Sequence, residues 1–241
     1  LRMVKWDRLW PGGLTFAFDD GPFKPSTDTF LLGGFAAPRR NDRVCDLGAG
    51  IGLLGLLLLG REPSVRVTDI DIDPAACALA EENLAANGLT GHRVLRADLR
   101  RREELPPAGS FDMAVSNPPY FAAGSGAAAA GQRGTARSEL TCTLAELCGA
   151  AAYLLRSGGQ FCLVHRAERL AELMALLRSY KLEPKELQTV QNTIDTPPRL
   201  VLLRCRKDGG TGLDIRPPLL LQNGDGMETE ALRRCYFRDR E

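Results

Sequence analysis

The sequence of 241 residues contains no apolar run long enough to cross a membrane. Its longest strongly apolar stretch, residues 51–59, is far shorter than the roughly 20 residues that a transmembrane helix needs. No charged segment followed by an apolar region opens the chain, so we expect no secretion signal. These features predict a cytoplasmic protein without a membrane anchor.

The sequence also has few side chains in a metal-binding pattern and almost no net charge. There are two histidines, His92 and His165, and none of the seven cysteines forms a Cys-x-x-Cys pair. We therefore expect no metal site, and we expect the thiols to be small core residues in a reducing compartment. Thirty-one Lys and Arg against thirty Asp and Glu leave a net charge of +1. That balance argues against unspecific binding to nucleic acid, but it permits a local basic face.

Short apolar runs alternate with helical patterns from about residue 41, which is typical of an α/β fold with a mainly parallel sheet. The predicted strands are 43–47, 65–70, 93–97, 111–116, 160–164, 186–191 and 200–206. The predicted helices are 51–59, 73–86 (with Asp73 as N-cap and Pro74 in the first turn), 140–154 (closed by 157–159) and 168–180. The pattern predicts a Rossmann-like fold: a seven-stranded, mostly parallel sheet with helices on both faces.

The two ends of the chain fit this alternation poorly. We assign residues 41–206 to one catalytic domain, residues 1–40 to an N-terminal extension that packs on it, and residues 207–241 to a C-terminal extension. The Gly- and Ala-rich segment 122–134 is predicted to be a mobile loop.

A glycine-rich turn follows the first predicted strand, in the segment Asp46-Leu47-Gly48-Ala49-Gly50-Ile51-Gly52. Glycine at such a turn permits a tight backbone and the close approach of a ligand. Asp71 follows the second strand, where a carboxylate can bind both hydroxyls of a ribose. Asp98 follows the third strand, where it can meet an adenine amino group or serve as an ordinary surface acid.

Two cofactors use this geometry. The segment from Gly50 to Gly55 spells G-x-G-x-x-G, with Asp69 and Asp71 about 20 residues on, as in dinucleotide-binding proteins. The carboxylate of Asp46, however, would repel a pyrophosphate and attract the ammonium group of S-adenosylmethionine. The dinucleotide register also places its glycines deep inside the predicted helix. We favour S-adenosylmethionine; the alternative without a ligand is a glycine turn that only shapes the connection.

The most specific motif, Asn117-Pro118-Pro119-Tyr120-Phe121, follows the fourth predicted strand. The prolines restrict the backbone, so the Asn117 side chain and the Pro118 carbonyl face one small space. Both oxygens can accept hydrogen bonds from a planar N–H₂ group and hold its nitrogen toward an incoming methyl group. Tyr120 can stack on an aromatic base, which is worth about 1–3 kcal/mol. The alternative is a strand-ending turn with an exposed tyrosine.

These two motifs together resemble those of class I methyltransferases that methylate exocyclic or amide nitrogens. The upstream segment Ser26-Thr27-Asp28-Thr29-Phe30-Leu31-Leu32-Gly33 and the downstream segment Ala136-Arg137-Ser138-Glu139 resemble the bacterial tRNA (adenine-N6)-methyltransferase family. That family acts on the adenine immediately 3′ of the anticodon in one valine tRNA. The resemblance implies a class I methyltransferase fold and S-adenosylmethionine as cofactor.

The resemblance also implies roles for individual residues. The cofactor residues would be Asp46, Gly48 and Gly50 at the methionine end, Asp71 at the ribose, Asp98 at the adenine, and Thr27 and Asp28 closing the site. The catalytic residues would be Asn117, Pro118 and Tyr120. Independently of the resemblance, we expect substrate contacts from Pro119 and Phe121 in the motif and from Arg133 and Arg137, whose loop directly follows it.

We therefore predict an S-adenosylmethionine-dependent N-methyltransferase that acts on N6 of an adenine in tRNA. Alternative substrates are a glutamine amide in a protein or a free small molecule. A non-catalytic cofactor-binding subunit is the alternative of a different class, and intact Asn117 and Tyr120 argue against it.

Overall fold

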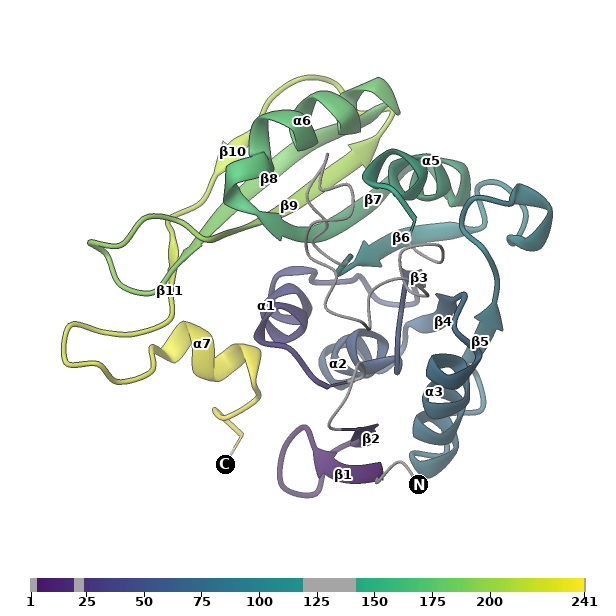
Figure 1. Cartoon of the computed structure of the whole chain (residues 1–241), viewed down its shortest axis with the longest axis horizontal. Helices are drawn as coiled ribbons and strands as arrows, with labels where there is room; N and C mark the ends of the chain where they lie inside the picture. Colours follow the sequence, from purple (N-terminus) through teal and green to yellow (C-terminus); the bar gives the residue numbers. More distant parts are fainter. Residues whose placement is uncertain (1–3, 20–23, 119–141, 241) are drawn as a thin grey trace, which may run out of the picture.

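The computed structural model describes residues 4–19, 24–118 and 142–240, which form an α/β structure around one large sheet (Figure 1). The strands are β1 (Val4–Arg8), β2 (Thr15–Asp19), β3 (Arg43–Leu47), β4 (Arg66–Asp71), β5 (Arg93–Arg96), β6 (Phe111–Ser116), β7 (Leu155–Arg166), β8 (Leu182–Gln191), β9 (Leu200–Lys207), β10 (Asp214–Ile215) and β11 (Leu219–Leu220). The α-helices are α1 (Thr27–Phe35), α2 (Leu53–Arg61), α3 (Pro74–Ala86), α5 (Leu144–Leu154), α6 (Leu170–Ser179) and α7 (Glu230–Cys235).

The large sheet has the strand order β10-β8-β9-β7-β6-β3-β4-β5, and β11 also pairs with β8. Strand β9 runs antiparallel to β7 and β8, whereas the other pairs are parallel. From β3 the chain builds outward through β4 to β5 and then returns to the opposite side of β3 as β6. The carboxyl ends of β3 and β6 therefore border the point where the strand order reverses, which is where open α/β sheets bind ligands.

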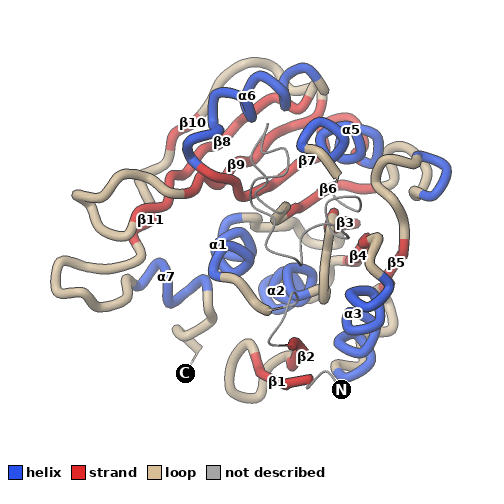
Figure 2. The backbone as a smooth tube through the Cα atoms, in the orientation of Figure 1, coloured by secondary structure: helices blue, strands red, loops and turns tan. Residues whose placement is uncertain are grey.

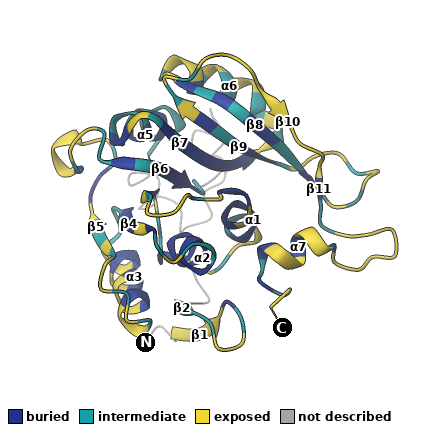
Figure 3. Cartoon of the chain, turned by 180° about the vertical axis from the view of Figure 1, so that it is seen from behind, coloured by how far each residue is buried: buried dark blue, intermediate teal, exposed yellow. Residues whose placement is uncertain are grey.

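Helices cover both faces of this sheet (Figure 2). Helices α5 and α6 share one apolar core with the sheet, and α1, α2 and α7 share another on the opposite face. A third cluster joins α1, α2 and α3 to strand β2. Figure 3 shows the result: the middle strands are largely buried, and exposed residues gather on the outer sides of α3, α6 and α7.

The predicted Rossmann-like fold, with a mostly parallel sheet and helices on both faces, is confirmed. The seven predicted strands correspond to β3 through β9, but the predicted count of seven is wrong. Strands β10 and β11 lengthen the sheet along β8, and each has only two residues. A strand of two residues is too short to show an alternation of apolar and polar residues. The prolines at 217 and 218, between β10 and β11, moreover indicate a loop.

The end of helix α5 also differs from the prediction. The sequence predicts a turn at residues 157–159 after the helix, yet β7 begins at Leu155, directly after Leu154. Gly158 has φ +75°, and the pairing of β6 with β7 shifts register between Phe111 and Met113. The glycines thus form an irregularity inside a strand. The predicted mobile loop, 122–134, lies outside the described residues.

Two asparagines, Asn83 on α3 and Asn87 at its C-cap, bind the N-terminal hairpin of β1 and β2 to the sheet domain. The Asn83 side chain accepts a hydrogen bond from Ala17 N (2.5 Å) and donates one to Ile51 O (2.8 Å). One helical turn later, Asn87 accepts from Thr15 N (2.8 Å) and donates to Thr15 O (2.7 Å). Because a side-chain amide carries both a donor and an acceptor, it can replace a neighbouring strand at the edge of β2.

We expect Asn83→Asp to lower the free energy of unfolding by about 1–3 kcal/mol at neutral pH. The substitution keeps the shape but replaces the donor to Ile51 O with a second oxygen at a buried position. Urea denaturation beside the exposed-site control Asn223→Asp measures the difference. Equal stability of the two variants would contradict this role for the amide.

The two chain ends meet on the side of α2. The rings of Trp10 and Phe237 lie 4.9 Å apart, and the Arg61 guanidinium lies 4.3 Å from the Phe237 ring. Arg61 also donates to the carbonyls of Arg234 and Cys235, each at 3.0 Å. The division into a catalytic domain and two extensions, at residues 40 and 206, stays a prediction.

Candidate active site

The glycine turn after β3 is held in place by the acid at the end of β4, Asp71. The Asp71 carboxylate accepts hydrogen bonds from Gly50 N (2.7 Å) and Asp73 N (2.8 Å). Gly48 and Gly50 have φ of +73° and +57°, and a Cβ added at either position would meet no neighbouring atom within 4 Å. These glycines are therefore required by backbone conformation, and the space in front of them is open to a ligand.

Two buried carboxylates lie beneath this turn. Asp46 is 1% exposed, and it pairs in register with Asp69, which is 2% exposed. Burial, reinforced by the charge of Asp71, raises the pKa of Asp69 to about 8. Burial, reinforced by the charges of Asp69 and Asp71, also raises the pKa of Asp46 well above its usual range. Asp46 Oδ2 has no hydrogen-bond partner among the described residues, so it is suited to receive a cationic donor.

The literal G-x-G-x-x-G has a packing explanation in this structure. Gly52 and Gly55 lie over Asp69, because strand alternation points Asp69 toward α2. A Cβ at Gly55 would lie 2.7 Å from Asp69 Oδ1 and 2.9 Å from Val67 Cγ1. The third glycine therefore permits close helix–strand packing and does not by itself indicate a dinucleotide.

We expect Gly55→Ala to lower the free energy of unfolding by about 1–3 kcal/mol, the usual cost of overpacking a close-packed interior. Thermal unfolding measures this against Gly91→Ala, where an added Cβ would meet nothing within 4 Å. A Gly55→Ala protein as stable as the Gly91→Ala control would show that the helix can shift freely from the strand.

Asn117 comes directly after β6, and it lies opposite the glycine turn at the point where the strand order reverses. The preceding residue, Ser116, is fully buried and donates from Oγ to Leu47 O (2.7 Å), which ties the end of β6 to the end of β3. Asn117 Nδ2 donates to Thr29 Oγ1 (2.9 Å) and to Ser26 Oγ (3.2 Å) at the start of α1. The N-terminal segment therefore contributes directly to the surroundings of the proposed catalytic asparagine.

One cavity of about 180 Å³ joins these elements. It is lined by Lys24, Pro25, Ser26, Thr29, Asp46, Gly48, Ala49, Gly50, Ile51, Leu53, Leu54 and Asn117. Its volume is below the roughly 300–1,000 Å³ of typical ligand pockets, so it can house one end of a cofactor-sized molecule. The unpartnered Asp46 oxygen and the open glycine turn fit the ammonium-bearing end of S-adenosylmethionine.

Asp98 does not line this cavity. Its carboxylate is held by Arg100, whose Nη2 lies 2.7 Å from Oδ2 and whose backbone N lies 2.9 Å from Oδ1. Hydrogen bonds from the Arg100 side chain lower the pKa of Asp98. The predicted contact with an adenine amino group stays a prediction, and it requires Asp98 to accept that bond in addition to those from Arg100.

The start of α1 presents different residues to the cavity from those that the resemblance implied. Ser26 and Thr29 line it, whereas Thr27 and Asp28, the predicted cofactor residues, do not. Ser26 is the helix N-cap and accepts from Thr29 N, and this Ser-x-x-Thr spacing is the signal that could have drawn attention to the pair. The predicted residues Pro119, Tyr120, Phe121, Arg133 and Arg137 lie outside the described residues.

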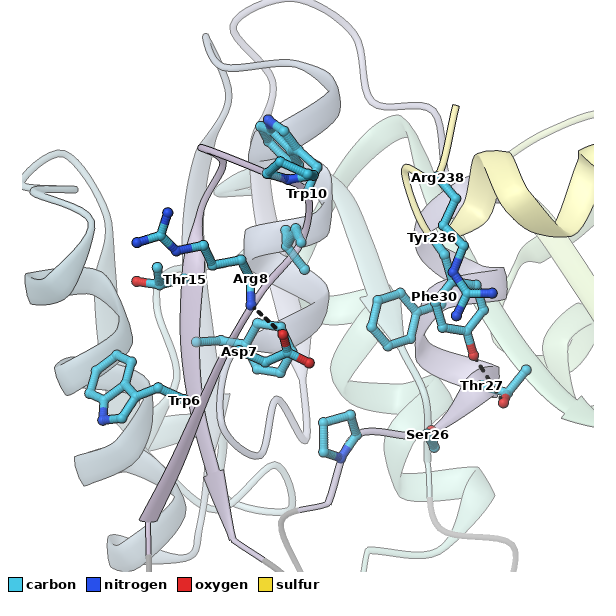
Figure 4. Close-up of a pocket in the computed structure, with 14 residues that line it drawn as sticks. Trp6, Asp7, Arg8, Trp10, Thr15, Ser26, Thr27, Phe30, Tyr236 and Arg238 are labelled. Carbon is cyan, nitrogen blue, oxygen red and sulfur yellow. Dashed lines mark hydrogen bonds between the residues drawn. The ribbon is translucent and has the colours of Figure 1, made fainter. Parts of the chain in front are cut away.

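A larger groove of about 770 Å³ adjoins the cavity and shares Pro25 and Ser26 with it (Figure 4). On one wall Tyr236 stacks on Phe30, with ring centroids 4.2 Å apart, and donates to Thr27 Oγ1 (3.0 Å). The other wall is the β1–β2 hairpin, from which Asp7 points toward Phe30 and Tyr236. Thr27 therefore faces this groove and links α1 to the C-terminal segment.

Within the described part of the chain, no group of three or more His, Cys, Asp or Glu side chains is arranged to hold a metal ion. None of the helices found there combines the length and apolar character that a membrane crossing requires.

The sheet is doubly wound, a glycine turn with an adjacent acid follows β3, and an asparagine that precedes a proline follows β6. Together these features define a class I methyltransferase. The chain belongs to the methyltransferase small domain family, whose model matches residues 25–183. It is 32% identical to the tRNA1(Val) (adenine(37)-N6)-methyltransferase of Dickeya chrysanthemi over 95% of both chains. It is 33% identical to the protein of the same name from Parabacteroides distasonis, over 77% of both chains. The resemblance noted from the motifs is thereby confirmed.

Solved structures support the fold assignment. A predicted O-methyltransferase from Agrobacterium tumefaciens has a TM-score of 0.72 at 23% identity, covering 87% of this chain and 95% of its own. The 16S rRNA N2 G1207 methyltransferase of T. thermophilus, solved with AdoMet and guanosine, has a TM-score of 0.60 at 24% identity. That match covers 86% of this chain and 51% of the other. At these identities the likeness concerns the fold alone.

Proposed function

We propose that this chain uses S-adenosylmethionine to methylate N6 of an adenosine in tRNA, at the position immediately 3′ of the anticodon. The relatives' name, tRNA1(Val) (adenine(37)-N6)-methyltransferase, supports this substrate. The cytoplasm, where tRNA is available, is the proposed location.

The observation that carries the proposal is the shared cavity. It has the buried, unpartnered Asp46 oxygen on one side and the Asn117 amide on the other. A cation that carries a methyl group and an amine that receives it can therefore meet between the ends of β3 and β6. The cofactor, when bound, supplies the methyl group.

The residues of the chain act by binding and orientation. Asp46 would hold the ammonium group of the cofactor, and Asp71, already bonded to the glycine turn, would bind its ribose. Asn117 Oδ1 and the Pro118 carbonyl would accept the two hydrogens of the target amine, which aims the nitrogen lone pair at the methyl group. The amine becomes more acidic as it acquires positive charge, so no strong base is needed at its nitrogen. Tyr120 would stack on the base, and Arg133 and Arg137 would contact phosphates.

The test is transfer of labelled methyl groups from S-adenosylmethionine to undermodified tRNA, followed by nucleoside digestion and chromatography. Label in N6-methyladenosine is the expected result. A transcript with guanosine in place of the target adenosine is the matched control and should remain unlabelled. Label absent from tRNA, in a protein that still binds the cofactor, would contradict the proposal and direct the search to protein glutamine amides or small molecules.

A further inference from the structure

We propose that Ser26 and Thr29 are positioning residues that set the orientation of the Asn117 amide. The inference rests on the proposed function, because it concerns the group that holds the target amine. Neither hydroxyl belongs to the glycine turn or to the Asn-Pro-Pro-Tyr motif. They approach Asn117 only in the folded protein, across separations of 91 and 88 residues.

Three hydrogen bonds connect these groups in a triangle. Asn117 Nδ2 lies 2.9 Å from Thr29 Oγ1 and 3.2 Å from Ser26 Oγ, and the two hydroxyl oxygens lie 3.0 Å apart. Ser26 Oγ also accepts from Thr29 N at 3.4 Å, as the N-cap of α1. The backbone of the helix start therefore holds the hydroxyl pair in place.

Among these three side chains, a count of protons favours one end of the Asn117 amide facing the hydroxyls. Two hydroxyl protons are available, and the short contact between Ser26 and Thr29 uses one of them. With Nδ2 toward the pair, its two protons supply both remaining hydrogen bonds, which makes three in total. With Oδ1 toward the pair, only one proton remains for two contacts, which makes two in total. The observed orientation is therefore favoured by about one hydrogen bond, and it points Oδ1 away from the hydroxyls.

Both sides of this contact are anchored in the core. Helix α1 buries Phe30, Leu31 and Leu32 after its first turn, and Ser116 ties the end of β6 to Leu47 O. Ser26 and Thr29 also line the cavity that Asn117 lines. The hydroxyl pair thus connects a rigid helix start to the catalytic asparagine and presents the Asn117 oxygen as an acceptor for the target amine.

The first test is steady-state methyl transfer to tRNA by Thr29→Val, which keeps the β-branched shape and removes the hydroxyl. We expect kcat to fall roughly tenfold, the effect of one lost hydrogen bond, with unchanged cofactor affinity and unchanged KM for tRNA. Thr29→Ser should restore kcat. The matched control is Thr189→Val on β8, a half-buried threonine without a side-chain hydrogen bond in the described structure, and it should behave as wild type.

A double-mutant cycle separates positioning from general damage to the fold. In an Asn117→Ala background, Thr29→Val should cause no further loss of kcat, because the group that it orients is absent. Additive losses would overturn the proposal, as would a Thr29→Val enzyme with wild-type kcat.

A second readout does not depend on activity. The side-chain N–H₂ signals of Asn117, assigned by their loss in Asn117→Asp, should shift in the ¹⁵N spectrum of Thr29→Val and return toward wild type in Thr29→Ser. Unchanged signals in Thr29→Val would overturn the proposal even if the substrate is not tRNA. Wild-type protein that leaves tRNA unlabelled, with the expected spectral shift present, would overturn the proposed substrate instead.

Discussion

Asn117→Ala is expected to lower the rate of methyl transfer by roughly 10²–10³-fold while cofactor affinity stays unchanged. The size of the effect follows from losing one preorganised polar group at the reacting atoms, together with the misplacement of the nucleophile. Asn117 contacts Ser26 and Thr29 and is separated from the buried acid beneath the glycine turn by the shared cavity. Its removal should therefore disturb the target amine more than the cofactor.

Single-turnover methyl transfer gives the rate, and calorimetric titration with S-adenosylmethionine gives the affinity. Asn223→Ala, at an exposed position, is the matched control. A variant that transfers methyl groups at the normal rate would rule out this mechanism. A variant with lost cofactor affinity would instead place Asn117 in the cofactor site.

Cofactor affinity is expected to rise with pH between about 6 and 7.5, and proton release should accompany binding. Burial raises the pKa of Asp46 well above its usual range and that of Asp69 to about 8, so the free protein holds a proton on this pair near neutral pH. Only an ionised Asp46 attracts an ammonium group, so we expect binding of the ammonium group to favour loss of a proton from this pair. Below the pKa of this carboxyl pair, each unit of increase in pH then strengthens cofactor binding by up to about tenfold. The range ends near 7.5 because the amino group of the ligand begins to lose its own proton above that pH.

Calorimetry in buffers with different ionisation enthalpies measures the protons released. Asp46→Asn should weaken binding by roughly 10- to 100-fold, the value of a hydrogen bond to a charged group, and should remove the pH dependence. Binding by the wild-type protein that is independent of pH and releases no proton would show that Asp46 is already ionised or does not contact the ligand.

Much of the fold could be predicted from local sequence patterns. Strands β3 and β6 have the predicted bounds, and α3 begins after the predicted cap, with Asp73 Oδ1 accepting from Ala75 N at 2.8 Å. Apolar periodicity and capping act within a few residues, so the sequence displays them directly. The two-residue strands β10 and β11 were missed because they form only along an existing edge of β8.

Some features of the candidate site follow from the sequence alone, whereas others follow only from the tertiary structure. The sequence by itself determined the glycine turn, its acids and the place of Asn117 after β6, because each depends on residue types at fixed short spacing. Only the tertiary structure decided that Asp46 and Asp69 lie side by side beneath α2. It also decided that Ser26 and Thr29, rather than Thr27 and Asp28, line the cavity beside Asn117. These outcomes depend on which side chains the sheet register and helix packing bring together from distant parts of the chain, and no local spacing encodes that.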